Sequence, residues 1–475
     1  MTDLELCYTP AADLARMIRD REVSSVEVTR AVLDRIGACE STLNAMMAVC
    51  DERALVEAAA ADEAVAAGGD VGPLHGVPFT VKDLVATEGV TTTFGSHVFA
   101  DNVPAADAWC VKGLRDAGAL LVGKTTTPEF GHKPFTEGPL FGRTLNPWDT
   151  TRTSGGSSGG AGAAAAAGYG PLHVGTDGGG STRIPAACCG VVGLKQTLGR
   201  VVQDMTPDSF NLLSYIGPIT RTVTDAALMM DAMGGEHLAD VHSRGRPVPD
   251  FAAAVAGATD LKGKRIGWRL TLGNDVVDTE TAKLFEDARD AFAEAGAELV
   301  LHDDTFNPTM SIWGPMTFSM WAARFGKYRD QWGNKMTSTL LKWMADGDNY
   351  SAIDLQRALE ERTRLYRQVE GWFQDIDLLL TPTLARTALP ADHDPFQPVE
   401  IEGTPVGEIR STWYPYTHPF NLSGNPAITL PAGWHSDGLP VAIQIVGPWL
   451  ADADVLAAAR VYERLRPWSE RRPEL

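Results

Sequence analysis

The sequence predicts an α/β protein, and two observations support this class. Short apolar segments of strand character recur along the chain, and segments with helical periodicity separate them. The chain has 475 residues, of which 44% are hydrophobic and 21% charged, as is typical of globular proteins with a sizeable core. The formal net charge is −20, so we do not expect a nucleic acid as partner.

The first expected elements are helices. Ser24-Ser25-Val26-Glu27 resembles a capping box, and apolar residues follow at helical spacing as far as Ile36. A second helix is expected from Glu52 to Ala67, where Gly68-Gly69 ends it. Both helices precede the first segment that has strand character.

Strands are expected next. In Leu74–Asp83 three apolar residues alternate with others, which predicts a strand with Lys82 on the face opposite those three. Gly118–Thr125 is a short apolar run and predicts a second strand. Near the end of the chain, Ala427–Pro448 predicts two strands joined by a turn at Asp437-Gly438.

The segment Gly118–Thr125 also matches the phosphate-binding P-loop pattern of NTPases. That motif needs a flexible loop whose backbone N–H groups surround phosphates. Here the middle residues are Ala, Leu, Leu and Val, which favour a strand, and Pro128 follows where the motif's helix should continue. We therefore keep nucleotide binding only as a remote alternative.

A second short motif, Gly155-x-Ser157-x-Gly159, matches the nucleophile elbow of α/β-hydrolases. With Ser157 as nucleophile, that fold requires an acid and a histidine downstream. His418 and His435 are available, but neither follows an obvious strand-end signature. This interpretation is also a remote alternative.

Three residues in separate segments predict acyl transfer more strongly: Lys82, Ser157 and Ser181. Ser157 follows Gly155-Gly156, and Ser181 follows Gly178-Gly179-Gly180, 24 positions further on. Successive glycine N–H groups can point into one concavity, and such a nest beside a serine suits the oxyanion of a tetrahedral intermediate. A single serine in a glycine-rich turn usually only caps the chain, but the combination points to catalysis.

Around these residues the sequence resembles the amidase signature family. The matching segments are GVPFTVKD, VGKTTTPEFG, GGSSGG, GTDGGGSTRIPA and CGVVGLKQT, and later FNLSGNPAITLP. The resemblance is close over about 70–240 and 415–465. The stretch TLNPWDTTRTSGGSSGG is similar to cyclic-amide (nylon-oligomer) hydrolases, aryl acylamidases and urethanases.

The resemblance implies the amidase signature fold, a mixed central sheet of about eleven strands flanked by helices. It implies a single domain over residues 1–475, made of three parts. These are a signature core at about 70–240, a variable substrate-pocket region at about 240–415, and a C-terminal return to the core at about 415–475.

The resemblance also implies a Ser–cis-Ser–Lys triad that needs no metal and no cofactor. Ser181 would be the nucleophile, Ser157 the cis-serine that relays a proton, and Lys82 the base. An ammonium group cannot accept a proton, so Lys82 must be neutral when it acts, and burial would lower its pKa. Asp83 follows directly, but strand alternation should point it away from Lys82.

Further site residues follow from the same resemblance. The oxyanion hole should consist of four consecutive N–H groups, those of Gly178, Gly179, Gly180 and Ser181. Asp177 and Arg183 should support this loop rather than take part in catalysis. The candidates for an apolar substrate pocket, each with ordinary core packing as the alternative, are Phe130, Gly156, Trp313, Met316, Met320, Trp321, Trp413, Tyr414 and Tyr416.

An apolar pocket favours small aryl or medium-chain amides, with carbamates (urethanes) and esters as further substrate classes. The main alternative is the A subunit of an aminoacyl-tRNA amidotransferase, which acts as a glutaminase. That subunit usually carries a DQxGPxxR element, and here the segment Leu213–Pro218 reads LSYIGP and lacks the Asp.

The six cysteines contain no C-x-x-C pair, so neither a disulfide scaffold nor a thiolate zinc site is expected. The start, MTDLELCYTP, has no apolar signal region, which favours a cytoplasmic protein without a membrane anchor. We expect a small-molecule amide or carbamate as the substrate, and a chain that is either a monomer or a homodimer.

Overall fold

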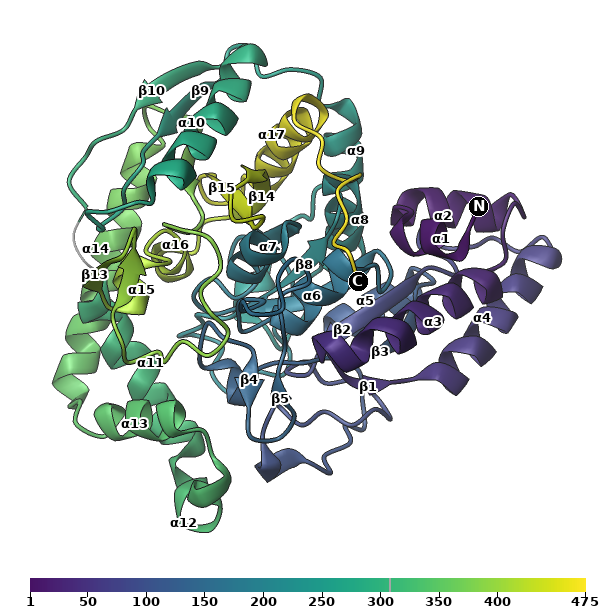
Figure 1. Cartoon of the computed structure of the whole chain (residues 1–475), viewed down its shortest axis with the longest axis horizontal. Helices are drawn as coiled ribbons and strands as arrows, with labels where there is room; N and C mark the ends of the chain where they lie inside the picture. Colours follow the sequence, from purple (N-terminus) through teal and green to yellow (C-terminus); the bar gives the residue numbers. More distant parts are fainter. Residues whose placement is uncertain (307–308) are drawn as a thin grey trace.

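A mixed sheet of eleven strands runs through the protein. A computed structural model describes residues 1–306 and 309–475 of the chain. The strands of the sheet are β1 (Met46–Val49), β2 (Pro78–Lys82), β3 (Leu120–Thr125), β6 (Leu172–Asp177), β7 (Val192–Lys195), β8 (Tyr215–Thr220), β9 (Arg265–Trp268), β10 (Glu298–Leu301), β11 (Leu378–Pro382), β14 (Ala427–Trp434) and β15 (Pro440–Val446). Their order is β1-β3-β2-β6-β8-β7-β14-β15-β11-β9-β10 (Figure 1). The prediction of a mixed sheet of about eleven strands is confirmed.

Helices cover both faces of this sheet, and Figure 1 shows α1–α4 at one end of the molecule with α10, α11, α13 and α14 at the other. The helices are α1 (Asp3–Tyr8), α2 (Ala11–Arg19), α3 (Ser25–Leu43), α4 (Asp51–Ala66), α5 (Trp109–Asp116), α6 (Gly159–Ala167), α7 (Arg183–Cys189), α8 (Val223–Met233), α9 (Phe251–Gly257), α10 (Thr279–Glu294), α11 (Met310–Phe325), α12 (Arg329–Trp332), α13 (Ser338–Gly347), α14 (Ala352–Trp372), α15 (Ile409–Thr412), α16 (His418–Ser423) and α17 (Asp452–Leu465). Two small hairpins lie outside the sheet, β4 (Glu137–Gly138) with β5 (Gly142–Arg143), and β12 (Val399–Ile401) with β13 (Thr404–Gly407).

The elements expected from local sequence patterns are present. Ser24 caps α3, and the reciprocal hydrogen bonds of a capping box with Glu27 are formed. The helix α4 lies one residue earlier at each end than expected. The strands β2 and β3 and the hairpin β14–β15 are found where the alternation and the apolar runs predict them.

The P-loop interpretation is wrong, because the segment that matches it forms the strand β3 inside the sheet. The side chain of Lys124 is buried and donates hydrogen bonds to the Val85 carbonyl, Thr87 Oγ1 and Thr92 Oγ1. A lysine held this way is not free to reach a phosphate group.

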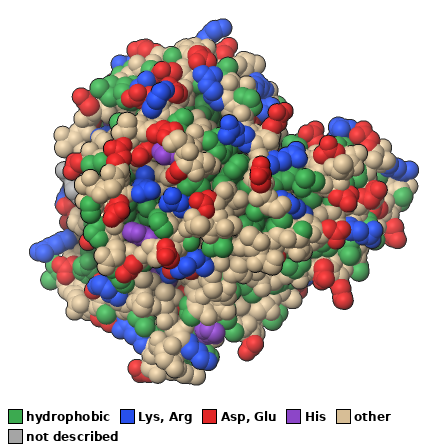
Figure 2. Space-filling view, viewed as in Figure 1, with side chains coloured by type: hydrophobic (Ala, Val, Ile, Leu, Met, Phe, Trp, Pro, Cys, Tyr) green, Lys and Arg blue, Asp and Glu red, His purple; other side chains and the backbone are tan. Residues whose placement is uncertain are grey.

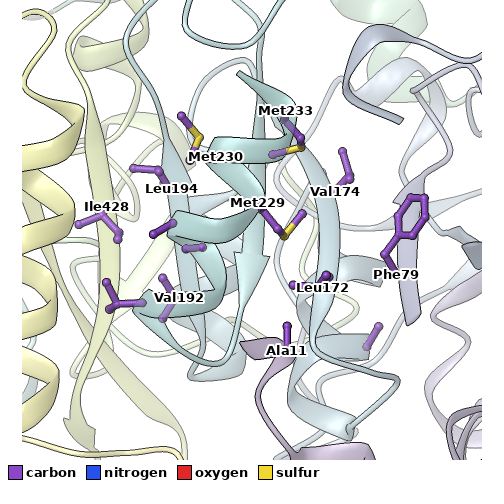
Figure 3. Close-up of a cluster of buried hydrophobic side chains, with 14 of the residues drawn as sticks. Ala11, Phe79, Leu172, Val174, Val192, Leu194, Met229, Met230, Met233 and Ile428 are labelled. Carbon is purple, nitrogen blue, oxygen red and sulfur yellow. The ribbon is translucent and has the colours of Figure 1, made fainter. Parts of the chain in front are cut away.

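Alternation along the strands places two apolar cores on opposite faces of the sheet. In β11, Leu378 and Leu380 join the larger core, whereas Leu379 joins the second. Figure 3 shows part of the larger core, where the methionines of α8 lie against apolar side chains of β6 and β7. In β2, Phe79 and Val81 belong to this core, so Lys82 faces the other side, as the alternation predicts.

The second face of the sheet carries α6 and α7, which pack against β6 and β7 respectively. The helix α6 is wholly buried, and its run of alanines combines high helix propensity with side chains small enough for close packing. Ser157 directly precedes α6, and Ser181 lies between β6 and α7. The fold therefore brings both serine loops to the face that Lys82 occupies.

The surface carries charges of both signs, and Figure 2 shows acidic and basic side chains interspersed over one face. Among the described helices, none is long and apolar enough to cross a membrane.

Candidate active site

The side chain of Lys82 ends among hydroxyl groups. Its Nζ lies 2.7 Å from Ser157 Oγ, 2.8 Å from Ser158 Oγ and 2.9 Å from Thr176 Oγ1. The lysine is fully buried. Because burial disfavours the charged form, the pKa of Lys82 lies well below its usual range, although the charge of Asp177 opposes this shift.

A second buried lysine on the neighbouring strand shows what sets Lys82 apart. Lys124 is also desolvated, but the negative charge of Asp83 partly offsets the burial, so its pKa falls only to about 8. Asp83 turns away from Lys82 and accepts hydrogen bonds from Thr93 and Gly95. The expectation that Asp83 points away from Lys82 is therefore confirmed.

Ser157 joins Lys82 to a cavity. The peptide bond between Gly156 and Ser157 is cis, as the resemblance implies. Ser157 lines the cavity on one side and contacts Lys82 Nζ on the other. A side chain on Gly131 would come within 3.2 Å of Ser157 Oγ, so the glycine there leaves the hydroxyl accessible.

Ser181 ends the glycine-rich turn that links β6 to α7. A Cβ on Gly179 would lie 2.6 Å from Trp313, and one on Gly180 would lie 2.4 Å from Thr417, so larger residues do not fit there. Gly180 also has a φ of +125°, which side chains disfavour. Gly178, Gly179 and Ser181 line the same cavity as Ser157.

The four expected oxyanion donors are not equivalent. The Gly180 N–H group donates to Asp177 Oδ1 at 2.6 Å, so it is already engaged. Among the described residues, the N–H groups of Gly178, Gly179 and Ser181 donate to no acceptor. Three of the four donors are therefore available to a bound ligand.

A buried ion pair fixes this turn. Asp177 and Arg183 are both fully buried, and Arg183 Nε donates to Asp177 Oδ2 at 2.9 Å. Asn421 donates to Asp177 Oδ1, and Arg183 also reaches Gln444. Burial opposes ionisation of Asp177, but the guanidinium and the other donors outweigh it and hold the pKa of Asp177 below its usual range. Asn421 and Gln444 were not predicted, since they lie far away in sequence.

A cavity of about 590 Å³ opens in front of the two serines. Six of the nine pocket candidates line it, namely Phe130, Gly156, Trp313, Met320, Trp321 and Tyr414. The sequence did not point to Phe94, Phe99, Phe325 and Arg410, which line it as well. The wall is largely aromatic, in agreement with the expected apolar pocket.

The remaining candidates, Met316, Trp413 and Tyr416, do not line the cavity, so their assignment to the pocket is wrong. All three are buried in the second core. The Trp413 ring stacks on Phe135, and the Tyr416 hydroxyl donates to the Leu270 carbonyl. These residues satisfy the alternative of ordinary core packing.

Two further residues at the lysine were missed. Ser158 Oγ donates to the Thr176 carbonyl at 3.0 Å and accepts from the Thr176 N–H group at 3.2 Å. The repeated serine in GGSSGG was a signal for Ser158. Thr176 has no signal of its own, because its role depends on the pairing of β2 with β6.

The α/β-hydrolase interpretation is wrong, since no described histidine contacts Ser157. His418 is buried against Trp313 and bonds Thr309, and His435 lies beside Asp278 and Glu280 at the surface. Within residues 1–306 and 309–475 no three His, Cys, Asp or Glu side chains form a group that could hold a metal ion.

Comparison with known proteins gives a consistent result. The profile of the family described as Amidase matches residues 27–456. An acylamidase of Rhodococcus erythropolis is 39% identical, with 100% of this chain and 98% of that protein covered. The glutaminase-type A subunit of the glutamyl-tRNA(Gln) amidotransferase of Moorella thermoacetica is 38% identical, with 99% of each chain covered.

Solved structures are similar over nearly the whole chain. A bacterial aryl acylamidase of the amidase signature family superposes with a TM-score of 0.90 at 33% identity, covering 98% of this chain and 97% of that one. A 6-aminohexanoate cyclic dimer hydrolase in complex with substrate gives a TM-score of 0.85 at 28% identity, covering 98% and 99%.

Proposed function

This chain belongs to the amidase signature family and is an amide hydrolase, and we propose that Ser181 is its nucleophile, Ser157 its proton relay and Lys82 its base. The observation that supports these roles most directly is the 2.7 Å contact between Lys82 Nζ and Ser157 Oγ, in a fully buried position beside the Ser181 loop. Lysine acts as a base only when it is neutral, and this burial favours the neutral form.

The hydrogen bonds around Lys82 fit a neutral amine, which has two N–H donors and one lone pair. Ser158 Oγ already donates its proton to the Thr176 carbonyl, so it accepts one N–H from Lys82. Thr176 Oγ1 accepts the other. The lone pair then remains for the Ser157 hydroxyl, which donates to Lys82 and is free to accept the proton of Ser181.

In the proposed reaction Ser181 Oγ attacks the carbonyl carbon of the amide and passes its proton to Ser157, which passes its own to Lys82. The protonated lysine then returns a proton through Ser157 to the leaving nitrogen as the C–N bond breaks. Amines are poor leaving groups unless they are protonated, so this two-way path suits amides. Water, deprotonated along the same path, hydrolyses the acyl-enzyme and regenerates Ser181.

The glycine turn would stabilise the oxyanion of each tetrahedral intermediate. The free N–H groups of Gly178, Gly179 and Ser181 are the available donors, and the buried Asp177–Arg183 pair holds the turn in place. Each donor of this kind contributes about 100- to 1000-fold to the rate. Asp177 and Arg183 act in this proposal as supports and do not touch the substrate.

We further propose that the substrates are small aryl or medium-chain amides, with aryl carbamates and esters as secondary substrates. The volume of about 590 Å³ is within the usual range for small-molecule pockets, and aromatic side chains form much of the wall. The acylamidase and aryl acylamidase relatives support the same class.

A substrate panel tests this proposal. Initial rates should be measured for acyl anilides, short aliphatic amides, a cyclic amide and aryl carbamates, with the Ser181→Ala variant as the blank for contaminating activity. We expect the highest kcat/KM for an anilide of two to eight acyl carbons, roughly the size the cavity admits. A clear preference for acetamide-sized amides over every anilide would contradict the proposed substrate class.

The glutaminase component of a tRNA-dependent amidotransferase remains a second candidate, because the relative from Moorella thermoacetica is 38% identical over 99% of each chain. The absent Asp in Leu213–Pro218 and the aromatic cavity wall argue against it. The test is hydrolysis of L-glutamine together with co-purification of a partner protein from the native host. Glutaminase activity above anilide hydrolysis would replace the first proposal by the second.

The wider organisation is also a proposal. One sheet contains strands from Met46 to Val446, which supports a single amidase domain over residues 1–475. The net charge of −20 supports a protein that binds no nucleic acid. The buried thiols of Cys188 and Cys189 suit the reducing cytoplasm. Light scattering would decide between monomer and homodimer, and cell fractionation would test the compartment.

A further inference from the structure

Arg410, on the short helix α15, lies in the cavity close to the glycine turn. It is 8% exposed and lines the cavity. Its Nη1 atom is 3.2 Å from the position that a Cβ on Gly179 would take. Consecutive Cα atoms are about 3.8 Å apart, so Gly179 and Ser181 are separated by at most about 7.6 Å. The guanidinium is therefore within reach of a substrate whose carbonyl lies at Ser181.

Aromatic rings hold this guanidinium, and no polar partner does. Its carbon lies 4.3 Å from the ring centre of Trp313 and 5.2 Å from that of Tyr414. Among the described residues, no side chain or carbonyl accepts a hydrogen bond from Arg410, and no carboxylate forms an ion pair with it. The other buried arginine of the site, Arg183, bonds a carboxylate and three further acceptors.

The contrast between the two arginines indicates a missing partner for Arg410. A guanidinium has five N–H donors, and a buried charge without hydrogen-bonding partners is costly. Stacking on aromatic faces fixes its position but leaves the edge of the group with its donors unused. Burial lowers the pKa of Arg410, yet arginine stays protonated in proteins. The group is thus a fixed cation directed at a ligand.

The rest of the cavity lining has the same sign of charge. Its cationic side chains are Lys133, Arg324, Lys327 and Arg410, and its one described acidic side chain is Asp204. The whole chain, in contrast, carries a net charge of −20. Lys133 is paired with Glu137, but this still leaves an excess of positive charge at the cavity. Such a local field favours the entry of an anion.

We propose that Arg410 binds a carboxylate carried by the substrate, a few bonds from the amide that is cleaved. Arginine binds carboxylates through two parallel N–H···O bonds, which orients the substrate as well as attracting it. The inference rests on the proposed amidase reaction at Ser181 and makes its substrate class more specific. The carboxylate has two possible sources: the acyl part, as in the half-amide of a dicarboxylic acid, or the amine part, as in an acylated aminobenzoate.

The experiment compares matched substrates on matched variants. Hexananilide is the neutral reference, the mono-anilides of succinic to adipic acid carry the carboxylate on the acyl part, and N-hexanoyl-4-aminobenzoate carries it on the amine part. Each is measured with the wild-type enzyme, Arg410→Gln, Arg410→Lys and Arg357→Gln, the last being an exposed arginine on α14. Thermal unfolding of each variant reports whether it is folded.

We expect the wild-type enzyme to prefer one carboxylate series over the neutral anilide. Arg410→Gln should lower kcat/KM for that series about 100-fold or more while lowering it far less for hexananilide. Arg410→Lys should retain part of the preference, and Arg357→Gln all of it. The preferred series identifies the source of the carboxylate. An equal loss on charged and neutral substrates would overturn the proposal, because Arg410 would then act on the reacting carbonyl or on the fold.

Binding without turnover separates this inference from the proposed reaction. With the Ser181→Ala protein, titration calorimetry should detect adipate or 4-acetamidobenzoate binding, and the corresponding neutral carboxamide should bind at least about tenfold more weakly. This measurement needs neither amide hydrolysis nor a folded Arg410 variant. Equal affinity for the carboxylate and the carboxamide would overturn the role of Arg410 even if anilides are hydrolysed.

Discussion

The cavity has two parts that are built in different ways. In the first part, formed by the ends of β2 and β6 and the serine loops, Lys82, Ser157 and the Asp177–Arg183 pair are buried and joined by hydrogen bonds. In the second part, formed largely by α11, side chains meet through ring stacking, as where Phe130 and Phe325 stack with their centres 3.9 Å apart.

The difference teaches which features a family can vary. A polar network has few alternative arrangements, since each buried donor and acceptor needs its partner. An aromatic wall keeps its packing through many exchanges of similar volume. The first part therefore fixes the reaction, and the second is free to set the substrate.

The largest effect is expected at the nucleophile. Ser181→Ala removes the atom that forms the acyl-enzyme, so kcat should fall by about 10⁴-fold or more. The measurement is single-turnover hydrolysis of a good anilide, with thermal unfolding as the control for folding. Turnover close to that of the wild type would contradict the assignment of the nucleophile.

The two buried lysines offer the next comparison. Lys82→Met should lower kcat/KM by about 100- to 10,000-fold, because the base is lost, while a side chain of similar length keeps the packing. Lys124→Met should instead destabilise the fold by about 3 kcal/mol or more, because it leaves Asp83 without its nearby cation. Denaturant unfolding and kcat/KM should be measured for both variants. Loss of stability without loss of activity in Lys82→Met would reverse the two roles.

The pH dependence follows from the burial of Lys82. Its lowered pKa means that the active, neutral form is present above that pKa and is lost as the pH falls through it. The rising limb of kcat/KM should therefore have its midpoint below about 10.4, the value of an ordinary lysine, and change about tenfold per pH unit below that midpoint.

His132 is the control for this limb, because it also lines the cavity. Burial lowers its pKa to about 3, so it stays neutral in the range where the limb is measured. The midpoint should remain in place in His132→Gln. A midpoint that moves or disappears in this variant would assign the titration to the histidine.

The smallest effects are expected from α11, where Met320 and Met316 are one helical turn apart. Met320 lines the cavity, so Met320→Ala should change the ratio of kcat/KM for large and small anilides by about tenfold. Met316 is buried in the second core, so Met316→Ala should cost about 2–5 kcal/mol of unfolding free energy with little change in that ratio. The opposite pattern would exchange the two positions.

The same division explains what could be predicted from sequence. Lys82, Ser157 and Ser181 lie in glycine-rich or alternating segments whose local pattern is distinctive. The pocket candidates were large apolar residues, and the sequence could not separate Trp313, which lines the cavity, from Trp413, which stacks in the core. Thr176 and Arg410 were missed, because their roles depend on strand pairing and on contacts between residues far apart in sequence.

The central claim is that the nucleophile is Ser181 and that Ser157, the serine of the Gly-x-Ser-x-Gly motif, only relays protons. Mass spectrometry of the enzyme after reaction with a fluorophosphonate tests this most directly. Both serines fall in the tryptic peptide that follows Arg152 and ends at Arg183, so fragment ions must locate the adduct. We predict that the adduct is on Ser181, and an adduct on Ser157 would contradict the claim.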